Sequence, residues 1–208
     1  MINNKLYVAN IGDCGGALIT QKDDGTYEAI KMNSKQAATS KKERARLIKE
    51  FPNDPDIVHQ SSSTAWYVKR RLMPTRAFGD LHLKHTEFNN PQNLSRSHGF
   101  KSRIDPWNGP YITHRPEIRV YEISEKTKGY VLASDGLWDE MKARDVAMKF
   151  SENPTINPQK FVDRLMEDAL EHAAATNGLS LRQIKEKKQG ERRNLHDDIT
   201  IMFVKLEG

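Results

Sequence analysis

The chain has 208 residues and one cysteine, Cys14, which excludes an intrachain disulfide and a zinc site built from several cysteines. Hydrophobic residues make up 37% and charged residues 29%, which is typical of a globular domain with a packed core and many polar loops. The net charge of +5 comes from basic residues interspersed with acidic ones, which disfavours a nucleic-acid groove, while a basic face for a phosphorylated or acidic partner stays open. We expect a single domain over residues 1–208.

Membrane and export signals are not apparent in the sequence. No apolar run approaches the roughly 20 residues that a membrane-spanning helix needs. The N-terminal residues Met1-Ile2-Asn3-Asn4 have neither a signal-peptide core nor an Arg-rich transit segment. The single cysteine is the natural composition of a protein in a reducing compartment.

Strand patterns dominate the first part of the chain. We expect strands at residues 5–10 and 17–20, joined as a hairpin by a glycine-rich turn at 12–16. A turn at Asp23-Asp24-Gly25 precedes a short strand at residues 27–31.

The middle of the chain combines one helix with long polar segments. Residues 41–51 have apolar side chains at helical spacing and end before Pro52. Within this helix the run Lys41-Lys42-Glu43-Arg44 is expected to be a solvated face. Residues 53–63 and 87–109 are polar and rich in turn-forming residues, which predicts irregular structure.

The C-terminal part mixes strands and helices without a regular β-α-β alternation. Strands are expected at 117–122, 130–134 and 199–206, and helices at 143–151, 158–175 and 181–188. Strands, then helices, then a final strand predict an α+β domain built in layers.

Acidic residues lie at the ends of three of these strands. Asp135 and Asp139 follow the strand at 130–134, and Gly136 between them would let the backbone turn sharply. Asp197 and Asp198 precede the last strand, and Asp13 follows the first. Hard cations such as Mg²⁺ take oxygen ligands of this kind, although aspartate also begins turns for purely local reasons. One metal site assembled by the fold is therefore one interpretation, and ordinary turn chemistry is the other.

Four segments, in order, carry a resemblance to a known family. They begin with Leu6-Tyr7-Val8-Ala9-Asn10-Ile11-Gly12-Asp13 and continue with Arg76-Ala77-Phe78-Gly79-Asp80, Val131-Leu132-Ala133-Ser134-Asp135-Gly136-Leu137-Trp138-Asp139 and His196-Asp197-Asp198-Ile199-Thr200. Together they resemble the later motifs of the PPM-type, or type 2C, metal-dependent Ser/Thr protein phosphatases. The segments 72–80 and 110–117 are similar to the pyruvate dehydrogenase phosphatase-like branch and the related plant group.

The resemblance implies a fold and a ligand set. The fold would be a two-sheet antiparallel β-sandwich flanked by helices, with a pair of Mg²⁺ or Mn²⁺ ions at one end. Asp135 would bridge to the metal pair, and Asp197 would bind one of its ions. Asp13 and Asp139, with Asp135, would frame a third, weaker metal position, and Asp80 would orient metal-bound water.

Family members also carry an N-terminal half with an Asp-Gly-His-Gly-Gly motif, and this sequence has no such segment. We therefore expect a partial domain that lacks the N-terminal half, and another chain or segment that completes it. Two functions follow from the resemblance. One is hydrolysis of phosphoserine and phosphothreonine on a phosphoprotein substrate, which this chain alone would perform poorly. The other is a catalytically inactive phosphatase-like scaffold or assembly subunit. The resemblance is compatible with an intracellular protein that is either mitochondrial or cytoplasmic.

Two residues near these motifs have competing interpretations. Arg76 either binds the substrate phosphate or pairs with an acidic residue such as Glu117 or Asp80. Cys14 stands where the family usually has Ser, and we expect a small buried residue there rather than a ligand, because carboxylate-rich magnesium sites do not favour sulfur.

Overall fold

The computed structural model describes residues 3–90, 102–188 and 190–206. The chain divides into two compact units. The first unit comprises Met1–Ala9, Cys14–Ser34 and Ile118–Gly208, and the second comprises Asn10–Asp13 and Lys35–Glu117. Each unit is described by itself below.

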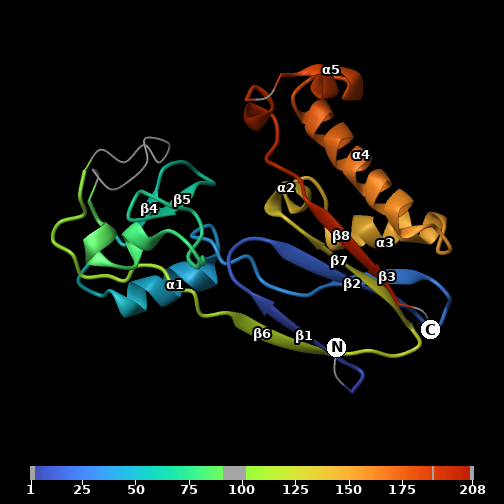
Figure 1. The fold of residues 1–208 in the computed structure, drawn as a ribbon, viewed down its shortest axis with the longest axis horizontal. Coiled ribbons are helices and arrows are strands. Elements are labelled where there is room, and N and C mark those ends of the chain that lie inside the picture. The colour runs from blue at the N-terminus through green and yellow to red at the C-terminus, as the bar shows by residue number, and fades with distance from the viewer. Residues whose placement is uncertain (1–2, 91–101, 189, 207–208) are drawn as a thin grey trace. The chain divides into compact units, whose positions relative to one another are not determined.

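A four-stranded antiparallel sheet forms the centre of the first unit (Figure 1). Its strands, in the order in which they pair, are β3 (Tyr27–Lys31), β2 (Gly15–Gln21), β7 (Thr127–Ala133) and β8 (Ile201–Lys205). In the register, Ala17 lies opposite Val131, and Val131 lies opposite Phe203. Residues two apart along each strand share a face, so these pairs repeat down the sheet.

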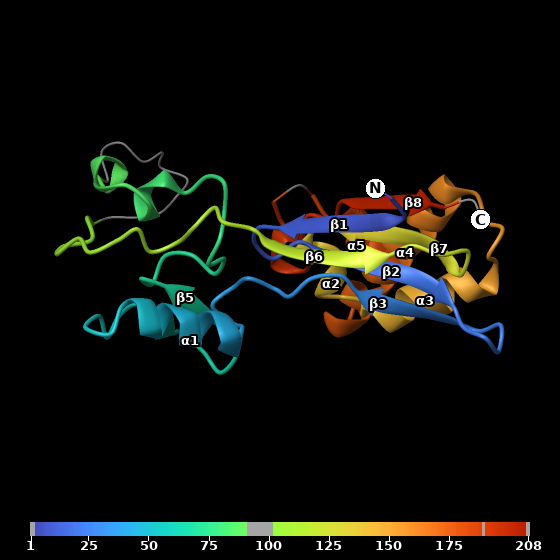
Figure 2. The same ribbon diagram turned by 90° about the horizontal axis from the view of Figure 1, so that it is seen from below.

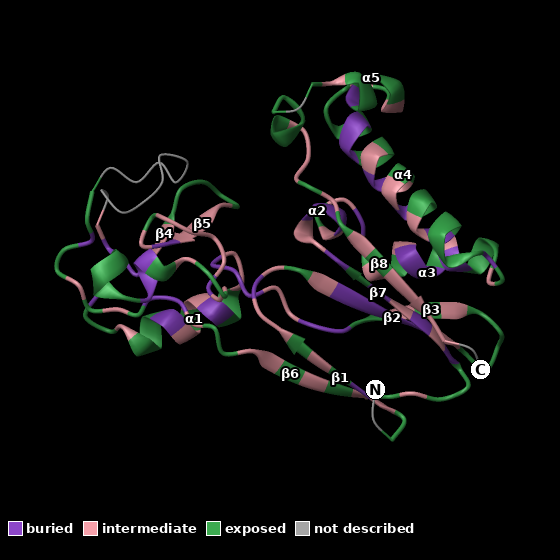
Figure 3. Cartoon of the chain, viewed as in Figure 1, coloured by how far each residue is buried: buried purple, intermediate pink, exposed green. Residues whose placement is uncertain are grey.

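Helices α3 (Ala143–Glu152) and α4 (Pro158–Thr176) cover one face of this sheet, as Figures 1 and 3 show. Phe161 of α4 packs on Phe203 of β8 with ring centroids 4.7 Å apart, and on Phe150 of α3 at 5.5 Å. The Asn157 side chain caps α4 by accepting a hydrogen bond from the Gln159 amide at 3.0 Å. The apolar spacing in these two segments predicted both helices, and the structure confirms them. Helix α5 (Leu181–Glu186) packs on the end of α4 through Ile184.

The other face of the sheet carries a second, two-stranded sheet formed by β1 (Lys5–Asn10) and β6 (Glu117–Glu122), as Figure 2 shows. Leu6 of β1 packs with Leu18 of β2 and with Met32 in a buried cluster. The two sheets therefore form the expected antiparallel sandwich flanked by helices. The predicted hairpin between residues 5–10 and 17–20 is wrong, because β1 pairs with β6 and β2 pairs with β3 and β7.

The second unit has a core of its own. Helix α1 (Lys41–Glu50) packs its apolar face on two short strands, β4 (Val58–Gln60) and β5 (Trp66–Val68), which pair with each other. Two 3₁₀ turns, η1 (Leu81–Leu83) and η2 (Thr86–Phe88), follow. Strand β4 falls in the segment 53–63 that the sequence predicted to be irregular, and β5 follows that segment. Of the long segment 87–109, also predicted to be irregular, residues 91–101 lie outside the described residues.

Within the described ranges, no helix combines the length and the apolar character that crossing a membrane requires.

Candidate functional site

Asp135 lies where strand β7 gives way to a short helix, α2 (Asp135–Trp138). Leu137 of this helix is fully buried in the main core of the first unit, and the Trp138 indole donates to the carbonyl of Ala133 at 3.1 Å. These anchors fix the turn that carries Asp135, which is itself half-buried. Asp139 caps the helix and is exposed, and its amide donates to the Asp135 carbonyl at 2.8 Å.

Gly136 brings this turn into contact with the segment that precedes the last strand. A Cβ atom on Gly136 would lie 2.5 Å from the carbonyl oxygen of Asp198 and 3.1 Å from that of Asp197. Real Cβ atoms do not approach backbone so closely, so only glycine fits here. From the sequence, we expected glycine at position 136 because the backbone turns sharply there. The structure corrects it, because Gly136 lies inside a helix and the requirement is this close approach.

Ser134 ties the same two segments together by hydrogen bonds. Its hydroxyl donates to the Asp198 carbonyl at 2.8 Å and accepts from the Thr200 amide at 3.0 Å. The Ser134 amide in turn donates to the Thr200 carbonyl at 3.1 Å. The main chains that carry Asp135 and Asp197 are therefore joined by packing and by hydrogen bonds.

The segment that leads to Asp197 is anchored by Leu195. Leu195 packs against the small core formed by Ala173, Ala174 and Ile184, and its carbonyl accepts from the side-chain amide of Asn177 at 3.3 Å. One oxygen of the Asp197 carboxylate accepts from the Asp198 amide at 2.8 Å and from the Arg193 guanidinium at 3.3 Å. Asp197 is thus a partly exposed carboxylate that already has a positive neighbour.

The first unit therefore brings Asp135 and Asp197 onto adjoining turns, with Asp139 at the far end of α2. Carboxylates in this position suit a hard divalent cation, which takes oxygen ligands completed by water. Across the described residues, however, no three His, Cys, Asp or Glu side chains are grouped closely enough to hold a metal ion. The carboxylates of Asp135 and Asp197 fit the oxygen ligands that such a cation takes.

Asp13 and Asp80 belong to the second unit and are described within it. The loop of Asp13 is held at Gly12, whose amide donates to the buried side chain of Gln36 at 2.9 Å. Gly12 has a φ of +99°, and the carbonyl of Arg76 lies 3.3 Å from where its Cβ would be. The Asp13 loop and the Arg76 segment therefore lie side by side.

Cys14, which follows Asp13, is exposed. The expectation of a small buried residue at this position is wrong. The glycine-rich segment is not enclosed by a hairpin, because its neighbour strands lie in different sheets.

Asp80 has a left-handed backbone with a φ of 54°. Its carbonyl accepts from the Leu83 amide at 2.9 Å and begins the turn η1. Burial lowers the pKa of the nearby Lys84, and the Asp80 carboxylate opposes that shift. Asp80 is thus half-buried beside a lysine at the start of a tight turn.

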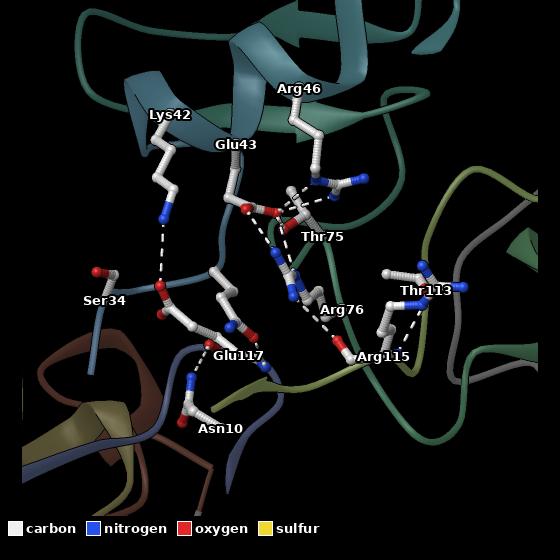
Figure 4. A network of polar contacts seen from close by, with 12 residues as sticks. Asn10, Ser34, Lys42, Glu43, Arg46, Thr75, Arg76, Thr113, Arg115 and Glu117 are labelled. Atoms are coloured by element: carbon white, nitrogen blue, oxygen red, sulfur yellow. Dashed lines mark hydrogen bonds and ion pairs between the residues drawn. The ribbon is translucent and has the colours of Figure 1, made fainter. Parts of the chain in front are cut away.

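Arg76 is bound by a residue that the sequence did not single out. Its guanidinium donates to the two oxygens of Glu43, at 3.0 and 3.5 Å, and to the carbonyl of Arg115 at 3.0 Å (Figure 4). Arg46 and the hydroxyl of Thr75 also donate to Glu43, at 2.8 and 2.6 Å. Burial raises the pKa of Glu43, but the hydrogen bonds from Arg76, Arg46 and Thr75 outweigh it and lower the pKa to about 2.

Glu43 also corrects the prediction of a solvated face at the start of α1. Its side chain is only 4% exposed, and Arg44 stacks on the ring of Trp66 at 4.2 Å. The signal for Glu43 was its position four residues before the buried Leu47, on the same face of the helix.

Comparisons with known proteins agree with this architecture. The family model described as protein phosphatase 2C matches residues 1–178, a range that includes Asp13, Asp80, Asp135 and Asp139 but ends before Asp197. The chain is 31% identical to probable protein phosphatase 2C 40 of Arabidopsis thaliana, over 99% of its own length and 40% of that protein. It is 30% identical to probable protein phosphatase 2C 78 of rice, over 99% of its length and 50% of that protein.

A solved structure, the serine-threonine phosphatase 2C of Toxoplasma gondii, superposes with a TM-score of 0.58 at 18% identity, over 99% of this chain and 55% of that one. At this identity the likeness concerns the fold. The chain spans about half the length of the curated relatives it matches. The match to the family model over most of the sequence shows that this chain belongs to the protein phosphatase 2C family.

Proposed function

We propose that the protein containing this chain hydrolyses phosphoserine and phosphothreonine on phosphoproteins, in a reaction that depends on Mg²⁺ or Mn²⁺. Membership of the protein phosphatase 2C family supports the reaction class. The observation that carries the proposal for this chain is the close packing of Gly136 on the Asp198 backbone, because it joins the turns of Asp135 and Asp197.

The carboxylates of Asp135 and Asp197 would hold metal on this side of the site. A pair of such ions supplies a water nucleophile at neutral pH and neutralises the phosphate oxygens. Asp139 and Asp13 would serve a third, weaker position. The positive charge of Arg193 stands near the Asp197 carboxylate and must give way to a bound cation.

We propose different roles for Asp80 and Arg76, one at the attacking water and the other in positioning neighbouring segments. Asp80 would orient the attacking water by accepting its hydrogen bond. Arg76 donates to Glu43 and to the Arg115 carbonyl, which supports a positioning role more than direct capture of the substrate phosphate.

We further propose that ligands from outside these 208 residues complete the metal site, supplied by another segment or another chain. Two facts support this: the described residues contain no cluster of three metal-binding side chains, and the relatives are about twice as long. The same absence of a cluster favours the second candidate function, a phosphatase-like scaffold without catalysis.

The motifs at residues 72–80 and 110–117 support placing the protein in the pyruvate dehydrogenase phosphatase-like branch and the related plant group. The single cysteine supports an intracellular location, in mitochondria or cytoplasm.

Calorimetric titration with Mn²⁺ tests the metal site. The matched pair is Asp135→Asn and Asp163→Asn, since Asp163 is an exposed aspartate on the solvent side of α4. We expect weak binding by the chain that Asp135→Asn abolishes and Asp163→Asn leaves unchanged. Equal binding by both variants would contradict the assignment of Asp135.

Hydrolysis of p-nitrophenyl phosphate with Mn²⁺ tests the reaction and the incomplete site. We expect little turnover by the chain alone, and an increase when the N-terminal region of the Arabidopsis relative is added. Strong turnover by the chain alone, lost in Asp135→Asn, would confirm the reaction but contradict the incomplete site. Metal binding without turnover in any mixture would favour the scaffold.

A further inference from the structure

The second unit contains a cavity of about 460 Å³ whose charged lining residues are mostly basic. Helix α1 contributes Arg46 and Glu50, and the segment from Pro110 to Arg115 contributes most of the remainder. The lining includes four cationic side chains against one carboxylate, a difference of three positive charges at neutral pH: Arg46, Arg76, Lys84 and Arg115 against Glu50. His85 and His114 also line it and add charge when they are protonated.

Two of the four cations are neutralised by neighbours. The buried Glu43 accepts from both Arg46 and Arg76, and Glu50 accepts from Arg46 at 2.7 Å. Lys84 is buried and donates to the carbonyls of Ala77 and Phe78, the latter at 2.9 Å.

Arg115 is the cation that is left available to a ligand. Its residue is exposed, and in the described part of the chain no carboxylate forms an ion pair with it. The cavity thus has its unbalanced positive charge at Arg115, because Lys84 lies near the Asp80 carboxylate and Arg46 and Arg76 are balanced by Glu43 and Glu50.

The backbone around this charge is fixed before any ligand arrives. The Arg115 carbonyl accepts from Arg76, and its amide donates to the hydroxyl of Thr113 at 3.1 Å (Figure 4). The Thr113 amide donates to the Thr75 carbonyl at 3.3 Å, and the Tyr111 amide donates to the Leu83 carbonyl at 2.8 Å. A site that is already ordered loses less conformational entropy on binding.

The cavity is larger than a free anion needs and is partly apolar. Tyr111 and Ile112 in its wall are almost fully buried, and Pro110 adjoins them. Pockets of this volume hold ligands of the size of a few linked groups. The unpaired guanidinium suits a phosphate group, because arginine can donate two parallel hydrogen bonds to phosphate oxygens. The apolar surface beside it suits a peptide chain that carries the phosphate.

We propose that this cavity is a docking site for a phosphomonoester group on a peptide segment of the substrate. The inference rests on the proposed function for the identity of the ligand as a phosphopeptide. Arg115 binds the phosphate oxygens, and the exposed Pro110 contacts the peptide. The site lies wholly within the second unit.

Fluorescence anisotropy tests the proposal, with a short labelled peptide that carries one phosphothreonine and the same peptide with unmodified threonine. The measurements are made in EDTA, so that neither metal binding nor hydrolysis contributes. The variants are Arg115→Gln and the matched control Arg103→Gln, which removes an exposed arginine of the same unit that does not line the cavity.

We expect the phosphopeptide to bind, Arg115→Gln to weaken its binding at least about fivefold, and Arg103→Gln to leave it unchanged. Inorganic phosphate alone should compete only weakly, since it lacks the contacts of the peptide. Equal affinity for both peptides, or equal loss in both variants, would overturn the proposal. Competition by free phosphate as strong as by the phosphopeptide would show an anion site without a peptide subsite and would also overturn it. This assay measures binding without hydrolysis. The docking proposal can therefore succeed or fail independently of the proposed phosphatase reaction.

Discussion

The main chain of Asp198 occupies the space that a side chain on Gly136 would need: a Cβ atom there would lie 2.5 Å from the Asp198 carbonyl oxygen. Replacing Gly136 by alanine must push the α2 turn away from the segment that carries Asp197. We expect Gly136→Ala to lower the free energy of unfolding by roughly 1–3 kcal/mol, as overpacking does elsewhere. Urea denaturation measures this. Gly79→Ala is the control, because no atom beyond the neighbouring residues lies within 4 Å of its added Cβ. An equal effect of the two changes would contradict the packing argument.

Ser134 makes the polar connection between the same segments. Its hydroxyl both donates to the Asp198 carbonyl and accepts from the Thr200 amide. We expect Ser134→Ala to lower the free energy of unfolding by about 1 kcal/mol, the usual net value for hydrogen bonds of this kind. Denaturation in urea checks the value, with Ser151→Ala as the control, since the Ser151 hydroxyl bonds only within its own helix. A loss for Ser134→Ala no larger than for the control would mean that backbone packing alone joins the segments.

Arg193 competes with any cation for the Asp197 carboxylate. The two side chains are 3.3 Å apart and both are partly exposed, so their attraction is of the modest size typical of surface ion pairs. If Asp197 is a metal ligand, Arg193→Gln should strengthen Mn²⁺ binding by up to about fivefold. Calorimetry measures the change, and Arg182→Gln, which removes another exposed helical arginine, serves as the control. Weaker binding in Arg193→Gln would show instead that Arg193 positions Asp197.

Glu43 should make stability depend on pH in the acid range. Its pKa is about 2 in the folded protein, below its ordinary value of 4.5, because the hydrogen bonds from Arg76, Arg46 and Thr75 outweigh burial. A lowered pKa in the folded state stabilises the protein above pH 4.5, and that stabilisation is lost as the pH falls from 4.5 toward 2. We expect Glu43→Gln to lower the free energy of unfolding by roughly 3 kcal/mol at pH 7 and by much less near pH 3.

Chemical denaturation at both pH values tests the Glu43 prediction. Glu50→Gln is the matched control, since Glu50 also pairs with Arg46 but is half exposed. Its effect should be well under 1 kcal/mol at either pH. A difference between Glu43→Gln and the unmodified chain that stays constant from pH 7 to pH 3 would contradict the lowered pKa.

Local patterns in the sequence sufficed for most elements of the fold. Helices α3 and α4 have apolar residues at helical spacing, and β7 is an apolar run, so each could be predicted within its own segment. The pairing of β1 could not, because its partner β6 lies more than a hundred residues away and the glycines between β1 and β2 imitate a hairpin turn. Strands β4 and β5 have three residues each, too few to show an alternating pattern.

In the candidate site, too, some features could be predicted from local sequence and others depend on contacts between distant segments. Asp135 and Asp197 could be named from motifs, but their proximity depends on the pairing of β7 with β8 and on the absence of a side chain at Gly136. Glu43 was hidden in a run of charges that resembles a solvated helix face. Its burial depends on Arg76, which is 33 residues further along the chain and binds it from another segment. Arg115 carried no signal, because its availability follows from which other cations are neutralised.

Most of the second unit is one continuous stretch of chain, Lys35–Glu117, which lies between strands β3 and β6 in the sequence. Strands β2, β3, β7 and β8, which pair with one another, all lie outside that stretch. The basic cavity is lined entirely by residues of that stretch, whereas the turns of Asp135 and Asp197 lie outside it. If the cavity docks the substrate as proposed, grafting this one stretch of chain between relatives would transfer substrate preference with it.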